Sequence, residues 1–133
     1  MKTLLCQYCN KDFQATRSDA VRCKPCHSAR KAEWQASPRG REMRRNNHRE
    51  LRKQAFAGYG GKCECCKEDN FEFLALDHVN GGGRKERESL STNQIARKVI
   101  NEGFPSSYRV LCHNCNQAKG WYGFCPHQWK RTA

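Results

Sequence analysis

Apolar and polar residues follow two different periods in the second half of the chain. They alternate over residues 71–79, which predicts the best strand in the protein, and residues 108–111 predict a short strand antiparallel to it. Residues 91–103 place apolar side chains at helical spacing, and residues 116–122 predict one or two further helical turns. Trp129 is expected to cover the core. These elements predict a small α+β domain.

A long polar segment precedes this domain. Ser37 and Pro38 form a helix-start signature, and Gly58 can end a helix in a left-handed conformation. We therefore expect one helix over residues 38–57, with only a narrow apolar stripe on its surface. Trp34, just before it, suits either packing or base stacking, and packing is the preferred interpretation.

The composition leaves little material for a large core. The chain has 133 residues, of which 37% are apolar, and its mean hydropathy is −0.99. Short chains with small hydrophobic cores need additional cross-links, such as disulfides or metal sites, and the ten cysteines are the evident candidates to form them. The N-terminus lacks the apolar stretch of a secretory signal, and no segment approaches the length of a membrane span. We expect a cytoplasmic protein that binds no membrane, located in the host cytoplasm if a phage encodes it. In that compartment the cysteines are expected to bind zinc rather than form disulfides.

Eight of the ten cysteines form four Cys-x-x-Cys pairs, a spacing typical of zinc ligands. They are Cys6 and Cys9, Cys23 and Cys26, Cys63 and Cys66, and Cys112 and Cys115. The first two pairs predict a zinc-ribbon or treble-clef module over residues 1–29, with a hairpin between the pairs. The last two predict a second structural Zn²⁺ site that joins two distant segments.

Four further potential zinc ligands, two cysteines and two histidines, have no assigned role. Cys65 and Cys125 exceed what two four-cysteine sites require, so they are either buried thiols or one of them replaces Cys63 as a ligand. His113 lies inside a Cys-x-x-Cys pair, and His127 lies near the C-terminus. The sequence leaves the roles of all four open.

Positive charge is concentrated in the N-terminal half. The formal net charge is +12, and residues 1–62 carry 15 of the 25 Lys and Arg residues but only 5 of the 13 Asp and Glu residues. This asymmetry indicates a segment that faces DNA phosphates, although a solvated linker helix is the alternative. The candidate DNA-binding side chains on the predicted helix are Arg41, Arg44, Arg45, Arg49, Arg52 and Lys53.

Three residues near the second set of cysteines suggest catalysis. Asp77 and Asn116 offer hard oxygen atoms to an ion such as Mg²⁺, and His78 can accept a proton near neutral pH. Together with the cysteine pairs, they predict a metal-dependent hydrolytic site built beside a zinc staple.

The motifs also occur in a familiar order. Leu76-Asp77-His78 lies between the Cys63/Cys66 pair and the run Cys112-His113-Asn114-Cys115-Asn116. Over residues 56–127 this order resembles the HNH endonucleases, and most of all the zinc-stapled phage group that includes recombination endonuclease VII. The resemblance implies a ββα-metal (His-Me finger) fold, small and zinc-stabilised, preceded by the N-terminal zinc module and the basic helix.

The resemblance also implies roles for individual residues. His78 would be the general base, Asp77 and Asn116 would hold a catalytic Mg²⁺ or Mn²⁺, and the product would be hydrolysed duplex or branched DNA. A homodimer could cut both strands, but the sequence does not decide whether the chain dimerises. Two features depart from the family pattern. Ser107 and Tyr108 stand where an Asn usually helps to fix the base, so that orienting role has no candidate, and the last motif residue is Asn116 rather than His, as in the endonuclease VII type.

The expected organisation is therefore a zinc module at 1–29, a DNA-contacting helix or linker at 30–57, and a nuclease domain at 58–133. The alternative function is a zinc-stapled DNA-binding protein without catalysis. The set Asp77, His78 and Asn116 favours the enzyme, because a protein that only binds DNA has no reason to keep all three.

Overall fold

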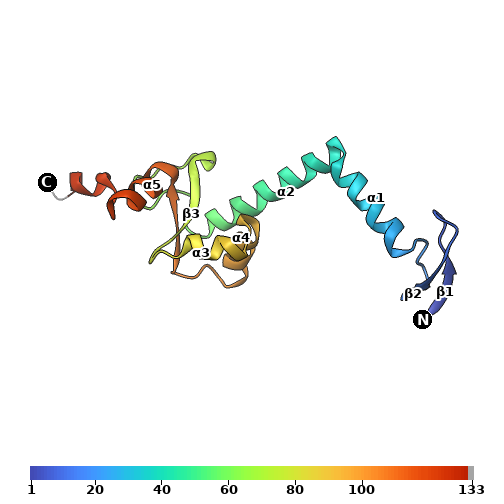
Figure 1. Cartoon of the computed structure of the whole chain (residues 1–133). Coiled ribbons are helices and arrows are strands. Elements are labelled where there is room, and N and C mark those ends of the chain that lie inside the picture. The colour runs from blue at the N-terminus through green and yellow to red at the C-terminus, as the bar shows by residue number, and fades with distance from the viewer. Residues whose placement is uncertain (132–133) are drawn as a thin grey trace. The chain divides into compact units, whose positions relative to one another are not determined.

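The structure is a computed structural model, and it describes residues 1–131. The chain divides into two units, Met1–Asn46 and Asn47–Ala133. The described residues form two small sheets, five α-helices and two short 3-10 helices (Figure 1). The protein is thus a small α+β protein, as predicted.

The first unit begins with a hairpin built around the first cysteine pair. Strand β1 (Lys2–Leu5) pairs antiparallel with β2 (Asp12–Ala15), with Leu5 opposite Asp12. Within the turn, the Cys6 N–H donates to the Lys11 carbonyl at 2.9 Å, and the Asn10 N–H donates to the Cys6 carbonyl at 3.0 Å. The prediction of a hairpin between the two cysteine pairs is wrong in this respect, because the first pair itself makes the hairpin turn.

A helix that the sequence did not predict follows. Helix α1 (Lys24–Ala36) starts at the second cysteine pair, directly after Cys23 as N-cap and with Pro25 in its first turn. None of its residues is buried, so it carries no apolar stripe that would reveal a helical period in the sequence.

Helix α2 (Pro38–Ala57) confirms the predicted basic helix and spans the boundary between the units. The Gly40 N–H donates to the Ser37 side-chain oxygen at 3.1 Å, which satisfies one of the unpaired amides at the helix start. Of the predicted stripe, Ala55 and Phe56 are buried in the second unit, whereas Met43 is exposed.

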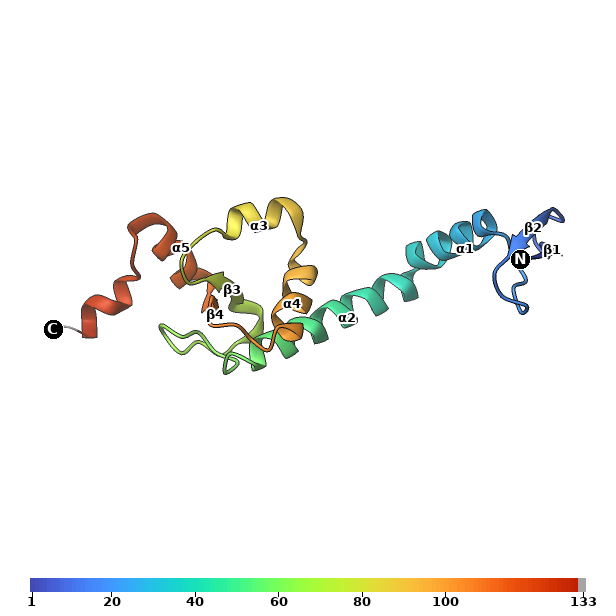
Figure 2. The ribbon, with the colours of Figure 1, turned by 90° about the horizontal axis from the view of Figure 1, so that it is seen from below.

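The sheet of the second unit is a two-stranded antiparallel pair, as predicted. Strand β3 (Leu74–His78) pairs with β4 (Tyr108–Cys112), and the register places His78 opposite Tyr108. The first strand begins three residues later than predicted, because the Asn70 side chain accepts the Glu72 N–H and starts a 3-10 turn, η1 (Phe71–Phe73). In Figure 2 the two strands lie side by side, and α5 (His113–Tyr122) lies next to them.

Two helices join the strands. The unpredicted α3 (Gly83–Ser89) follows Gly82, whose φ of 91° is left-handed, and has no buried residue. Helix α4 (Thr92–Asn101) confirms the predicted helix. Its N-terminus has a full capping box, in which Ser91 accepts the Gln94 N–H and the Gln94 side chain accepts the Ser91 N–H.

Helix α5 starts three residues earlier than predicted. Cys112 is its N-cap, and its Sγ accepts the Cys115 N–H at 3.4 Å. The helix ends at Gly123, which has a φ of 77°, and a 3-10 segment, η2 (Pro126–Arg131), follows. Trp129 in this segment is 64% exposed and packs against Phe124, so the expectation that it covers the core is wrong.

The second unit has two small clusters of buried residues. One joins the end of α2 to the sheet and α5, and it consists of Phe56, Cys63, Leu74, Val110, Leu111, Cys112, Cys115 and Cys125. The other joins α2 to α4 and β4, and it consists of Ala55, Ile95, Ala96, Val99 and Tyr108. Half of the first cluster is cysteine, so this core is completed by thiols rather than by large apolar side chains.

Candidate functional site

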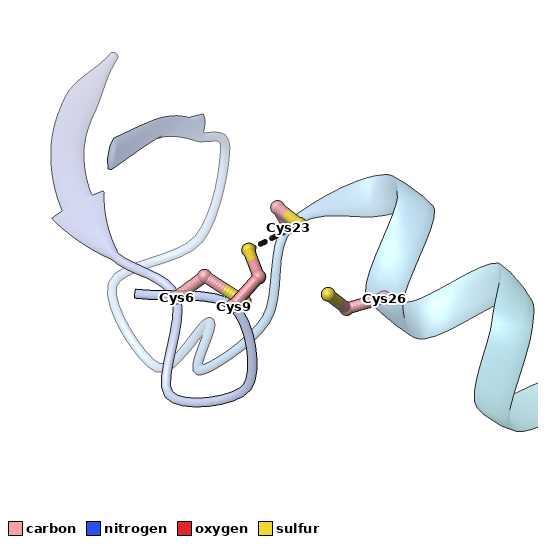
Figure 3. Close-up of side chains that lie close together, drawn as sticks. All are labelled: Cys6, Cys9, Cys23 and Cys26. Carbon is pink, nitrogen blue, oxygen red and sulfur yellow. Dashed lines mark hydrogen bonds between the residues drawn. The ribbon is translucent and has the colours of Figure 1, made fainter. Parts of the chain in front are cut away.

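The N-terminal cysteines converge as predicted. Cys6 and Cys9 lie in the hairpin turn and Cys23 and Cys26 at the start of α1, with their side chains directed toward one another (Figure 3). All four Sγ atoms lie within 4.8 Å of one another, and those of Cys9 and Cys23 are 3.7 Å apart. Thiolates around one tetrahedral zinc are about 3.8 Å apart, so this tetrad is compatible with a structural zinc site.

The environment of Cys6 favours its thiolate form. A hydrogen bond from the backbone N–H of Cys23 is the main cause that lowers the pKa of Cys6 to about 6. Burial acts in the opposite direction, and the backbone N–H groups of Tyr8 and Cys9, in the same turn, help to outweigh it. A thiolate at neutral pH is the form that binds zinc.

Tyr8, between the two cysteines of the hairpin turn, packs against positive charge. The guanidinium groups of Arg22 and Arg30 lie over its ring, 4.5 Å and 4.9 Å from the centroid. Cations are attracted to the face of an aromatic ring. These contacts connect the hairpin turn to the residue before Cys23 and to α1, beside the tetrad.

The second predicted tetrad also forms. Cys63 and Cys66 lie in the loop before η1, Cys112 ends β4, and Cys115 lies in the first turn of α5. Their four Sγ atoms lie within 4.8 Å of one another, and those of Cys66 and Cys112 are 3.6 Å apart. Burial acts to raise the pKa of Cys63, but nearby backbone N–H groups lower it to about 7. This tetrad too is compatible with zinc.

His78 has a partner that the sequence did not reveal. Its Nε2 lies 2.5 Å from Oε2 of Glu86, which projects from α3, and both side chains are largely buried. Sequence reasoning missed Glu86 because the residue lies in a charged stretch without periodicity and α3 itself was not predicted. Glu86 thus contacts the side chain for which the sequence offered no orienting partner.

Glu86 is held in its charged form. Burial acts to raise its pKa, but hydrogen bonds from Lys98 and Tyr108, each 2.7 Å from Oε1, and from His78 lower the pKa to about 2. An ionised carboxylate only accepts hydrogen bonds, so Nε2 of His78 carries the proton. In neutral His78 the lone pair is then on Nδ1, the atom beside Gly83.

His78 and Asn116 line the same pocket, which has a volume of about 250 Å³. Arg52, Arg87 and His113 also contribute to its wall, together with apolar side chains such as Phe56 and Ile95. The structure therefore brings together two of the three predicted catalytic residues, one from the end of β3 and one from the first half of α5.

Asp77 makes different contacts. Its Oδ2 accepts from Arg109 Nε and from Lys119 Nζ, each at 3.0 Å, and Asp77 is not among the residues that line the pocket of His78. Lys119 Nζ also lies 3.3 Å from the carbonyl oxygens of His78 and Val79. Three oxygen atoms thus converge on one cation at the end of β3.

The candidate DNA-binding residues of α2 differ in their surroundings. Arg41 and Arg44 donate to carbonyl groups at the end of α1, and Arg45 and Lys53 are exposed. Arg49 forms an ion pair with Glu72. Arg52 is half-buried, lies over the Phe56 and Phe71 rings, and donates to the Leu74 carbonyl at 3.3 Å, so packing occupies it.

Comparisons with known proteins identify no relative: no family model, no curated protein and no solved structure matches the chain. None of the helices in the described residues is long and apolar enough to cross a membrane. The interpretation of the site thus depends on its own geometry.

Proposed function

We propose that the protein is a metal-dependent DNA endonuclease of the HNH type, in which His78 is the general base. The observation that carries this proposal is the contact between the ionised Glu86 and His78, which lines a pocket together with Asn116. A largely buried histidine paired with a carboxylate is suited to remove a proton from water next to a phosphate.

The His78 ring would act through one defined atom. Glu86 accepts the proton on Nε2, so Nδ1 would receive the proton of the attacking water. Tyr108 supports this orientation from the other side, because its ring lies 4.6 Å from that of His78 and its hydroxyl donates to Glu86. Arg87, on the pocket wall, would bind a phosphate oxygen.

Asp77 and Asn116 are the residues that would hold the catalytic Mg²⁺ or Mn²⁺. At this end of β3, the Asp77 carboxylate and the His78 and Val79 carbonyl oxygens lie 3.0 to 3.3 Å from Lys119 Nζ, and such oxygens are the ligands that Mg²⁺ and Mn²⁺ prefer. Asn116 would have to approach the ion from the pocket of His78, which it lines. When bound, a divalent ion supplies positive charge to the phosphate and to the leaving oxygen. It would compete with Lys119 and Arg109 for the Asp77 carboxylate.

Exposed arginines on α2 would bind the DNA backbone. The helix has no acidic residue in its first turn, and residues 41–50 are all exposed. Contacts of this kind position a duplex without reading its sequence.

The test is cleavage of supercoiled plasmid by the zinc-loaded protein, with and without added Mg²⁺ or Mn²⁺. We expect nicked or linear DNA only when the ion is present. His78→Ala should reduce cleavage at least 100-fold, because general base catalysis is typically worth about 10²–10⁴-fold, while it leaves DNA binding unchanged. His48→Ala, which alters an exposed histidine on α2, is the matched control and should cleave like the wild type.

One observation favours the alternative function, a zinc-stapled DNA-binding protein without catalysis. The Asp77 carboxylate is already neutralised by Arg109 and Lys119, as expected of a structural ion pair. If the wild type and His78→Ala bind DNA equally and neither cuts plasmid or branched DNA with either ion, the nuclease proposal is wrong and this alternative stands.

A further inference from the structure

Three potential ligands outside the second tetrad gather around one of its members. Cys65, Cys125 and His127 place their ligand atoms within 4.8 Å of one another and of Cys115 Sγ. His127 Nδ1 lies 3.4 Å from Cys115 Sγ and 3.2 Å from Cys125 Sγ. Sulfur and nitrogen ligands of one tetrahedral zinc are about 3.5 Å apart, so these positions suit a second ion.

Cys115 belongs to both groups of ligands. A thiolate sulfur has more than one lone pair, so it can bind two metal ions at once. We propose that the second unit holds a two-zinc cluster in which Cys115 Sγ bridges the ions. The other ligands of the first zinc are Cys63, Cys66 and Cys112, and those of the second zinc are Cys65, Cys125 and His127. This proposal does not rest on nuclease activity.

The second zinc would leave the net charge of the cluster unchanged. One zinc with four thiolates has a net charge of −2. The second zinc adds two positive charges, and the thiolates of Cys65 and Cys125 add two negative charges. With a neutral His127 the cluster therefore remains at −2, and two thiol protons are released to solvent. Cys65, Cys115 and Cys125 also line a pocket of about 220 Å³, together with Glu64, Arg109 and Lys119.

The course of the backbone explains how the ligands reach both ions. Cys65 lies between Cys63 and Cys66 in sequence, but the loop places its thiol with Cys125 and His127. Gly123, with a φ of 77°, ends α5 and lets the chain turn toward Cys115, so that Cys125 is buried. The second zinc would thus attach the start of η2 to the core, where few apolar side chains of that segment are buried.

The first test is the zinc content of the full-length protein after passage over a chelating resin, measured by mass spectrometry. We expect three ions per chain: one in the N-terminal tetrad and two in the cluster. His127→Gln should reduce the number to two, and since His127 is exposed the variant should fold. His113→Gln is the matched control, because His113 belongs to neither group of ligands, and it should retain three.

The second test detects the bridge itself. The protein is loaded with cadmium-113, and correlations between cysteine β-protons and the metal are recorded by NMR. We expect the β-protons of Cys115 to correlate with two cadmium resonances and those of every other cysteine with one. Two zinc ions per wild-type chain, three in His127→Gln, or a single cadmium partner for Cys115 would each overturn the two-zinc cluster.

Discussion

At the scale of single residues, the site depends on small contacts around His78. Glu86 holds Nε2, the Tyr108 ring packs against the imidazole, and Gly83 leaves space at Nδ1. A Cβ atom added at Gly83 would lie 2.7 Å from Nδ1, closer than real Cβ atoms come to any neighbour. Glycine is therefore required at position 83 because the His78 ring leaves no space for a side chain, and not because of the backbone conformation.

Gly83→Ala tests this contact. The added methyl group should displace the His78 ring and reduce plasmid cleavage at least tenfold. The ring nitrogen resonances of His78 should move in the NMR spectrum, which reports the displacement without any assay of activity.

Gly120→Ala is the control for this prediction. Gly120 lies in α5, and a Cβ atom there would meet no neighbour within 4 Å. This variant should keep both cleavage and the His78 resonances while gaining helix stability. Unchanged His78 resonances in Gly83→Ala would refute the proposed contact.

At the scale of elements, α2 combines two kinds of arginine. Arg49 is paired with Glu72 and lies over the Phe71 ring, so it contributes to packing in the second unit. Arg45 is exposed and has no ion-pair partner among residues 1–131. The sequence pattern does not separate the two, because both occupy the same polar helix.

This difference predicts different effects on DNA binding. Arg45→Ala should lower the slope of log affinity against log salt concentration by about 0.9, the value for one lost phosphate contact on duplex DNA. Arg49→Ala should lower it by less, since Glu72 already neutralises that charge. Fluorescence titrations of a labelled duplex at several salt concentrations measure both slopes, and equal reductions would contradict the distinction.

At the scale of the whole molecule, each unit has its own cysteine clusters and little apolar core. In the first unit, Cys6 and Ala15 are the buried apolar residues, which is too small a core to fold a chain of this length. In the second unit, four of the eight residues of the larger cluster are cysteines. Metal binding should therefore supply much of the folding free energy in both.

Cys26→Ser tests this independence. Loss of one ligand from the N-terminal tetrad should collapse the amide resonances of residues 1–36, while those of residues 47–129 keep their positions. Cys112→Ser should have the converse effect. A variant that unfolds both units would show that the two folds are coupled.

Much of the fold could be predicted from local patterns. The start of α2, helix α4, the two strands of the second unit and the four Cys-x-x-Cys pairs follow from capping residues, periodicity and ligand spacing, which act over a few residues. Helices α1 and α3 could not be predicted in this way, because neither buries a residue and so neither shows an apolar stripe.

The sequence by itself determined the cysteine pairs, the basic helix and the order of the strands, because each depends only on residues that are close together in the chain. Only the tertiary structure decided which side chains meet across the chain. It placed Glu86 against His78, paired Asp77 with Arg109 and Lys119, and gathered Cys65, Cys125 and His127 around Cys115. Such contacts depend on how the chain turns at Gly82 and Gly123 and on how its helices pack, which no local pattern records.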